Sequence, residues 1–251
     1  MRAPFVTERL HSLTHLREAL GDLSLDDRLK RVRAAIPGRI VLTTSFGIED
    51  QALCHAVFSL GLEIDVVTLD TGRLFPETYS VWAETEARYD RRIRAFYPRH
   101  DALEAHIDGH GINGFYASVE NRKACCEVRK VEPLARALDG AEAWITGLRA
   151  DQSSARSAVD AISHDPARGL IKINPLYDWD RPTVVEYVKR HAVPYNQLHD
   201  KGYLSIGCQP CTRALEPGEP ERAGRWWWEA DEKKECGLHV AADGRLVRRS
   251  A

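Results

Sequence analysis

The chain of 251 residues lacks any apolar run close to the ~20 residues that a membrane-spanning helix needs. Charged side chains, among them Arg2, Glu8 and Arg17, interrupt its first twenty residues, which therefore contain no secretory hydrophobic segment. The formal net charge is only −2, which gives no case for binding nucleic acid through its phosphates. Internal repeats and low-complexity segments are also absent from the sequence. We therefore expect a cytosolic protein that binds neither membranes nor nucleic acid.

Cysteine is scarce, with six in the chain, but four of the six form two close pairs. Cys125 and Cys126 are adjacent, and a disulfide across one peptide bond would close a strained ring. Cys208 and Cys211 form a CxxC pair, which in the cytosol favours metal or redox chemistry over a structural bridge. Together the pairs predict a metal or iron–sulfur site, with Lys130 among the nearby cations that would offset the thiolate charge. The alternative is a buried apolar pair and an unrelated CxxC loop.

Segments typical of strands and helices alternate along the chain. Short β-branched or apolar runs predict strands at residues 39–44, 65–69, 93–97, 143–146 and 170–173. Apolar residues at helical spacing predict helices at residues 7–20, 25–35, 49–60, 76–89, 125–138 and 181–191. This order predicts an α/β fold with a mostly parallel sheet and helices on both faces. Ligands of such sheets bind beyond the carboxyl ends of the strands, where the loops after the first, second and fourth predicted strands lie.

The last forty residues differ in composition from the rest. From residue 212 onward they contain several glycines and prolines and show no clear hydrophobic period. The length of the chain allows one large domain with an appendage. We therefore expect a nucleotide-binding α/β domain over residues 1–211 that also carries the cysteine site, and a C-terminal tail over residues 212–251. The three consecutive tryptophans at 226–228 are expected to pack this tail onto the domain.

The loop after the first predicted strand has the composition of an anion site. Residues 43–50 (TTSFGIED) place hydroxyls, a glycine and a helix N-terminus together. Free backbone N–H groups and the positive end of the helix dipole would bind an anion there. The loop is not a Walker motif, because no Gly-Lys-Ser/Thr follows. An ordinary turn with Ser45 as the helix cap is the alternative.

Three loops resemble one known family when they are taken together. Residues 45–50 (SFGIED) are similar to the modified pyrophosphate loop of the adenylyl-sulfate and phosphoadenylyl-sulfate reductases, which have an adenine-nucleotide α-hydrolase-like fold. Residues 69–72 (LDTG) and 146–149 (TGLR) resemble the second and third nucleotide loops of these reductases. The resemblance implies that nucleotide is bound by Ser45, Phe46, Gly47, Glu49, Asp50, Leu69, Thr71, Gly147, Arg149 and Arg156.

The cysteine pairs make the resemblance more specific. They are similar to the ligand set of the assimilatory adenylyl-sulfate reductase branch, which carries a [4Fe–4S] cluster. Reductases that act on 3′-phosphoadenylyl sulfate typically lack these four cysteines. The resemblance implies Cys125, Cys126, Cys208 and Cys211 as cluster ligands, and it places Lys130 between the cluster and the substrate.

Two further basic residues are assigned by the same resemblance. Arg222 and Arg225, within residues 221–226 (ERAGRW), look like the pair that holds the phosphosulfate group. A solvated basic turn is the alternative for these two residues.

The segment at residues 233–239 (KKECGLH) contains a cysteine outside the two pairs. Cys236 follows two lysines, and nearby cations favour the thiolate and lower the pKa of a thiol, which makes it a better nucleophile. The Glu-Cys-Gly-Leu-His block also resembles the most diagnostic motif of the reductases. It implies Cys236 as the nucleophile and His239 as a substrate contact. The remaining cysteine, Cys54, lies in an apolar stretch and is expected to pack in the core.

The resulting hypothesis is a reductase of adenylyl sulfate in sulfate assimilation. Cys236 would form an S-sulfocysteine and release AMP, and thioredoxin would then release sulfite. The [4Fe–4S] cluster would have a structural and electrostatic role. The alternatives are a 3′-phosphoadenylyl-sulfate reductase, an ATP pyrophosphatase from whose loop Phe46 and Asp50 depart, and a zinc-stabilised nucleotide-binding module. Assembly into a homo-oligomer is left open by the sequence.

Overall fold

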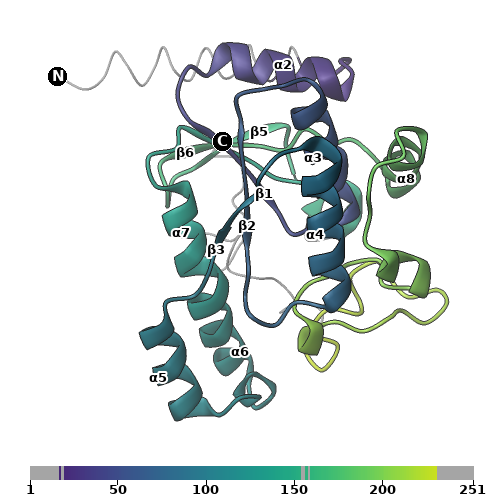
Figure 1. The fold of residues 1–251 in the computed structure, drawn as a ribbon. Coiled ribbons are helices and arrows are strands. Elements are labelled where there is room, and N and C mark those ends of the chain that lie inside the picture. Colours follow the sequence, from purple (N-terminus) through teal and green to yellow (C-terminus); the bar gives the residue numbers. More distant parts are fainter. Residues whose placement is uncertain (1–16, 18–19, 154–155, 158, 231–251) are drawn as a thin grey trace.

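The protein is built around a six-stranded sheet, seen in a computed structural model that describes residues 17, 20–153, 156–157 and 159–230 (Figure 1). The strand order is β3-β2-β1-β4-β6-β5. All neighbours are parallel except β5, which runs antiparallel to β6. The strands are β1 (Ile40–Thr44), β2 (Asp65–Leu69), β3 (Arg94–Phe96), β4 (Ala143–Ile145), β5 (Ile162–Asp165) and β6 (Leu170–Ile173). The prediction of a mostly parallel α/β sheet is confirmed.

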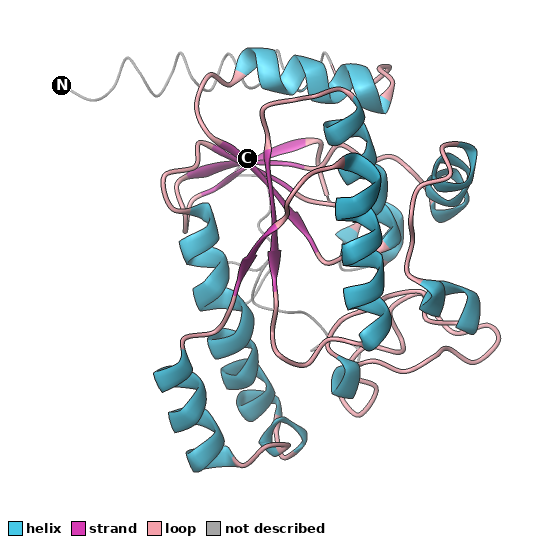
Figure 2. Ribbon diagram, in the orientation of Figure 1, coloured by secondary structure: helices cyan, strands magenta, loops and turns pink. Residues whose placement is uncertain are grey.

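Helices cover both faces of this sheet, as Figure 2 shows by colour. Their bounds are α2 (Leu25–Ala35), α3 (Ile48–Ser59), α4 (Pro76–Tyr89), α5 (His100–His110), α6 (Val119–Cys126), α7 (Glu132–Leu138) and α8 (Arg181–Arg190). In the described part of the chain, no helix is both long and apolar enough to cross a membrane. Most of the predicted helix at residues 7–20, together with Cys236 and His239, lies outside the described residues.

The alternation of side chains along β1 explains why the sheet has two apolar faces. Ile40 and Leu42 belong to a core cluster that also contains residues of α2, α3 and α4. Val41 points the other way, into a second cluster with Leu134 and Leu138 of α7. Figure 1 shows α3 and α4 on one side of the strands and α7 on the other. The buried strands therefore read as continuous apolar runs in the sequence.

The sequence did not predict two elements of the fold, α5 and β5. None of the residues of α5 is buried, so its sequence carries no strong apolar stripe. The strand β5 lies at the edge of the sheet, and three of the four residues in its short sequence, ISHD, are polar. Both segments are held by contacts with neighbouring elements, which leave little trace in local periodicity.

The helix predicted over residues 125–138 is interrupted. A π-helical turn, Glu127–Val131, joins α6 to α7. Pro133 stands in the first turn of α7 and has no N–H to donate to the carbonyl of Arg129 four residues earlier. The π-helical turn immediately before this proline carries Lys130, so it helps to position a predicted site residue.

The described part of the C-terminal segment, residues 212–230, packs on the rest of the chain. Thr212 and Arg225 form an isolated antiparallel bridge, and Trp226 is almost fully buried. Glu229 binds Arg122 of α6 through two hydrogen bonds, of 2.9 Å to Nε and 2.7 Å to Nη2. The packing brings residues of this segment to the sheet's carboxyl edge, while the division of the chain after residue 211 stays a prediction.

Candidate functional site

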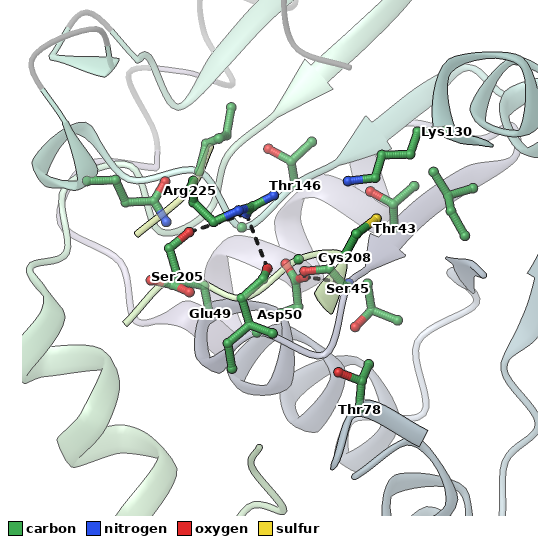
Figure 3. Close-up of a pocket in the computed structure, with 18 of the residues that line it drawn as sticks. Thr43, Ser45, Glu49, Asp50, Thr78, Lys130, Thr146, Ser205, Cys208 and Arg225 are labelled. Atoms are coloured by element: carbon green, nitrogen blue, oxygen red, sulfur yellow. Dashed lines mark hydrogen bonds between the residues drawn. The ribbon is translucent and has the colours of Figure 1, made fainter. Parts of the chain in front are cut away.

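A cavity of about 200 Å³ opens where β1, β2 and β4 end, at the carboxyl edge of the sheet. The loops that follow these strands form one wall, and the segments 204–208 and 221–226 form another. Figure 3 shows the cationic groups of Arg225 and Lys130 and the thiol of Cys208 around this space. The predicted site residues that line the cavity are Ser45, Gly47, Glu49, Asp50, Leu69, Thr71, Lys130, Gly147, Arg156, Cys208, Arg222 and Arg225.

The loop after β1 is tightly folded at the entrance to α3. The backbone N–H and the hydroxyl of Ser45 donate to the Asp50 carboxylate at 2.7 and 2.8 Å (Figure 3). Phe46 has a φ of 59°, an unusual value for a residue with a side chain. Gly47 is the N-cap of α3 and supplies no side-chain hydrogen bond. Gly47, Glu49 and Asp50 at this helix start line the cavity, and the N–H groups of a helix's first turn are suited to bind an anion.

Asp50 is the most perturbed carboxyl group of the cavity. Burial raises its pKa to about 6, although the hydrogen bonds from Ser45 work in the opposite direction. Gly147, in the loop after β4, closely approaches this carboxylate: a Cβ atom there would lie 2.5 Å from Asp50 Oδ1. A glycine is needed at this position because of the close approach, and the β1 and β4 loops are thereby packed together.

Phe46 and Arg149 lie outside the lining of the cavity. The Phe46 ring points into the core and stacks on Trp82 with ring centroids 5.5 Å apart. The Arg149 guanidinium is fully buried and binds the carboxylates of Glu49 and Glu221. Substrate contacts for these two residues therefore stay predictions.

The cations of the cavity come from distant parts of the chain. Arg225 donates to the carbonyl of Ile206 at 3.3 Å and to the Ser205 hydroxyl at 3.4 Å, which directs its side chain toward the cavity (Figure 3). Lys130 reaches the same space from the π-helical turn before α7. Arg222 and Arg156 also border it. Several positive groups thus surround a space large enough for part of an anionic ligand.

A second, much smaller cavity of about 20 Å³ is lined by all four paired cysteines. Cys125 and Cys126 come from the end of α6, and Cys208 and Cys211 come from the loop before the C-terminal segment. No disulfide joins any of the cysteines that the structure describes. The fold has therefore brought together two pairs that are far apart in the sequence, which contradicts the alternative of unrelated pairs.

The chemistry of these thiols fits a cationic metal group. Burial, followed by the neighbouring Cys208, raises the pKa of Cys211 to about 12, and burial also raises the pKa of Cys125. Such thiols remain protonated at neutral pH unless a metal displaces the protons. Among the described residues, no three His, Cys, Asp or Glu side chains converge tightly enough to hold a single metal ion. A multinuclear cluster, which spreads its ligands over several metal atoms, is compatible with both observations.

The two cavities share a wall. Lys130, Cys208 and Trp226 line both of them. The Thr71 hydroxyl lies 3.3 Å from Cys208 Sγ, and Arg129 Nη1 donates to the Thr71 carbonyl at 2.6 Å. The second predicted nucleotide loop is therefore in direct contact with the cysteine site.

Sequence reasoning missed several hydroxyl groups of the larger cavity. They stand near the end of β2, on α4 and in the loop before Cys208, and they belong to Thr68, Thr78 and Ser205. For Thr68, the position near the carboxyl end of a strand was an available signal. Threonine is also common in strands for its β-branched shape, so the residue type alone could not single them out.

A mostly parallel sheet with a phosphate-type loop, here residues 45–50, at its carboxyl edge is typical of nucleotide-binding α/β proteins. The family model "Phosphoadenosine phosphosulfate reductase domain" matches residues 39–214, and the chain belongs to this family. The family membership expected from the loops and the cysteines is thereby confirmed.

Curated relatives carry a more specific name. The chain is 56% identical over 226 residues to an adenosine 5′-phosphosulfate reductase from Sinorhizobium fredii strain USDA 257, covering 90% of each protein. It is 53% identical to the protein of that name from Agrobacterium fabrum, covering 96% of this chain and 95% of the relative. The similarity therefore extends over almost the whole chain.

Solved structures agree on the fold. A phosphoadenylyl-sulfate reductase from Candida auris, in a phosphate complex, superposes with a TM-score of 0.70 at 31% identity, covering 80% of this chain and 96% of that one. Yeast FAD synthetase, at 16% identity, gives a TM-score of 0.53 over 85% of this chain and 70% of its own, which shows likeness of fold alone.

Proposed function

We propose that this protein reduces adenylyl sulfate to sulfite and AMP in assimilatory sulfate reduction. The observation that carries the proposal is the shared wall between a cationic nucleotide-type cavity and a cavity lined by four cysteines. The relatives at 53% and 56% identity are named for the same substrate, adenosine 5′-phosphosulfate. We place the reaction in the cytosol, where thiols stay reduced.

The reaction divides between the cavity and the thiol of Cys236. Arg222, Arg225 and Lys130 neutralise the oxygens of the phosphosulfate group, which leaves its sulfur open to attack. The Cys236 thiolate forms a bond to that sulfur, the bond from sulfur to the phosphate oxygen breaks, and AMP leaves with the electron pair. A thiolate of thioredoxin then attacks the Cys236 sulfur, sulfite leaves, and the second thioredoxin thiol completes a disulfide and frees Cys236. His239 is proposed to assist in sulfate binding.

Cys125, Cys126, Cys208 and Cys211 would hold a [4Fe–4S] cluster. Bound there, it would supply a fixed charge beside the cavity and order the loop that leads into the C-terminal segment. Lys130 borders both spaces, so its positive charge would interact with both the cluster and the sulfate. The electrons of the reaction enter through thiols, so the cluster has no redox step to perform.

The experiment that tests this function is an assay of the anaerobically purified protein for iron, sulfide and zinc, followed by turnover with thioredoxin. We expect about four irons and four sulfides per chain, and sulfite and AMP from adenylyl sulfate. Cys211→Ser should lose the iron, whereas the matched variant Cys54→Ala, which changes a core cysteine outside the cluster cavity, should keep it. Stoichiometric zinc without iron would instead support a nucleotide-binding module. Sulfite release by Cys236→Ser would contradict the mechanism.

The principal alternative substrate is 3′-phosphoadenylyl sulfate. It is favoured by one specific observation, the likeness to the phosphoadenylyl-sulfate reductase structure. Rates measured with the two nucleotides under the same conditions decide between them. A higher kcat/KM with the 3′-phosphorylated nucleotide would overturn the proposal.

A further inference from the structure

Arg149 is the most completely enclosed charged side chain near the nucleotide cavity, with a side-chain exposure of 0%. All three of its guanidinium nitrogens donate to carboxylates. Nε donates to Glu49 at 3.0 Å, Nη1 to Asp151 at 3.0 Å, and Nη2 to both oxygens of Glu221 at 2.8 and 3.0 Å. A guanidinium engaged in this way has few N–H groups left to donate to a ligand phosphate.

The three carboxylates belong to different parts of the molecule. Glu49 lies in the first turn of α3, within the phosphate-type loop, and Asp151 follows the loop after β4. Glu221 belongs to the C-terminal segment and directly precedes Arg222, which lines the cavity. Arg181 of α8 lies 3.9 Å from the same Glu221 carboxylate. Arg149 therefore ties the C-terminal segment to the nucleotide loops.

We propose that the buried ion pair between Arg149 and Glu221 is a clasp that holds Arg222 and Arg225 in the cavity, so that Arg149 acts as a positioning residue. The inference rests on the proposed function for the identity of the ligand. The planar fork of arginine suits the role, because it reaches three carboxylates at fixed angles, which a lysine ammonium cannot do. Without the Arg149 guanidinium, the Glu49 and Glu221 carboxylates would face each other with little compensating charge, so the closed arrangement is favoured.

The same segment contains a matched control. Arg213 and Glu219 form another bidentate pair, with both contacts at 2.7 Å, but its side chains are 34% and 28% exposed and do not border the cavity. An exposed pair contributes little to stability. Glu219→Gln therefore makes the same chemical change as Glu221→Gln, in the same segment, without touching the clasp.

The test compares adenylyl sulfate with AMP, which lacks the sulfate group. Binding of each is measured by calorimetry in a full-length Cys236→Ser background, so that the nucleotide is not consumed. In Glu221→Gln we expect the affinity for adenylyl sulfate to fall by about tenfold or more, as for the loss of a charged hydrogen-bonding partner. The affinity for AMP should change much less, because the adenosine loops remain in place. Glu219→Gln should leave both affinities unchanged.

An equal loss of both affinities together with a lower melting temperature would mean that the pair is merely structural, and would overturn the proposal. Unchanged binding of adenylyl sulfate would also overturn it. A second measurement is independent of the substrate: trypsin should cleave after Arg222 and Arg225 faster in Glu221→Gln than in Glu219→Gln. If the unmodified site binds no adenylyl sulfate, the proposed function fails, while the cleavage rates still decide whether the clasp exists.

Discussion

Replacing Asp50 by asparagine should change how the stability of the protein depends on pH. The pKa of Asp50 is raised by burial to about 6 in the folded protein, against an ordinary value of 3.8. Between these two values the folded state holds a proton that the unfolded state has lost. The stability due to this group is therefore complete below about pH 4 and declines as the pH rises to about 6.

The size of the effect follows from the same two values. They differ by about 2 pH units, and each unit corresponds to 1.36 kcal/mol, so ionisation of Asp50 costs roughly 3 kcal/mol. This is an upper value, because Asp50 borders the cavity and water there screens its charge. Asparagine can still accept both hydrogen bonds from Ser45 with its side-chain oxygen, but it cannot ionise.

The assay is denaturant unfolding of the wild type and Asp50→Asn between pH 4 and 7.5, without oxygen. The variant should gain stability relative to the wild type as the pH rises, by up to roughly 3 kcal/mol, and the difference should level off above pH 6. Asp27→Asn is the matched control. Asp27 is exposed and the Ser24 hydroxyl lowers its pKa, so this variant should instead lose stability relative to the wild type as the pH rises. If Asp50→Asn and the wild type show the same pH dependence, the argument from burial is refuted.

Two further substitutions test other contacts of the site. Glu229→Gln removes the carboxylate that pairs with the buried Arg122 guanidinium, 1% exposed, and should lower the free energy of unfolding by about 3–5 kcal/mol, measured by urea unfolding. A loss below about 1 kcal/mol would show that the pair is dispensable. Gly207→Ala places a Cβ 2.2 Å from Arg225 Nη2, so the guanidinium must move and KM for adenylyl sulfate should rise several-fold. Gly109→Ala, with nothing within 4 Å, is its control in steady-state kinetics, and equal KM values for the two variants would contradict the steric argument.

Much of the fold could be predicted because its buried strands are local features of the sequence. The central strands β1 and β2 are β-branched runs placed between helical segments, and each was predicted to within a residue of its observed bounds. The loops after β1, β2 and β4 were expected to meet at the carboxyl edge, and the cavity there confirms that expectation. Parallel topology alone brings these loops together.

The directions of individual side chains could not be predicted in the same way. Phe46 and Arg149 stand in loops assigned to nucleotide binding, yet the ring of Phe46 packs in the core and Arg149 is buried against carboxylates. A φ of 59° at Phe46 turns its side chain away from the cavity. Glu221, which binds Arg149, is 72 residues away in the chain. Local patterns contain no information about such partners.

By itself, the sequence determined the class of fold, the family and the grouping of the cysteines in pairs, because these are written in short motifs and in hydrophobic periodicity. Only the tertiary structure decided that the paired cysteines line one cavity and that Lys130, Cys208 and Trp226 form the wall it shares with the nucleotide-type cavity. It also decided that Arg149 joins the nucleotide loops to the C-terminal segment. The physical reason is that these contacts depend on how the π-helical turn and residues 204–230 pack against the sheet, and packing between distant segments is settled only when the whole chain folds.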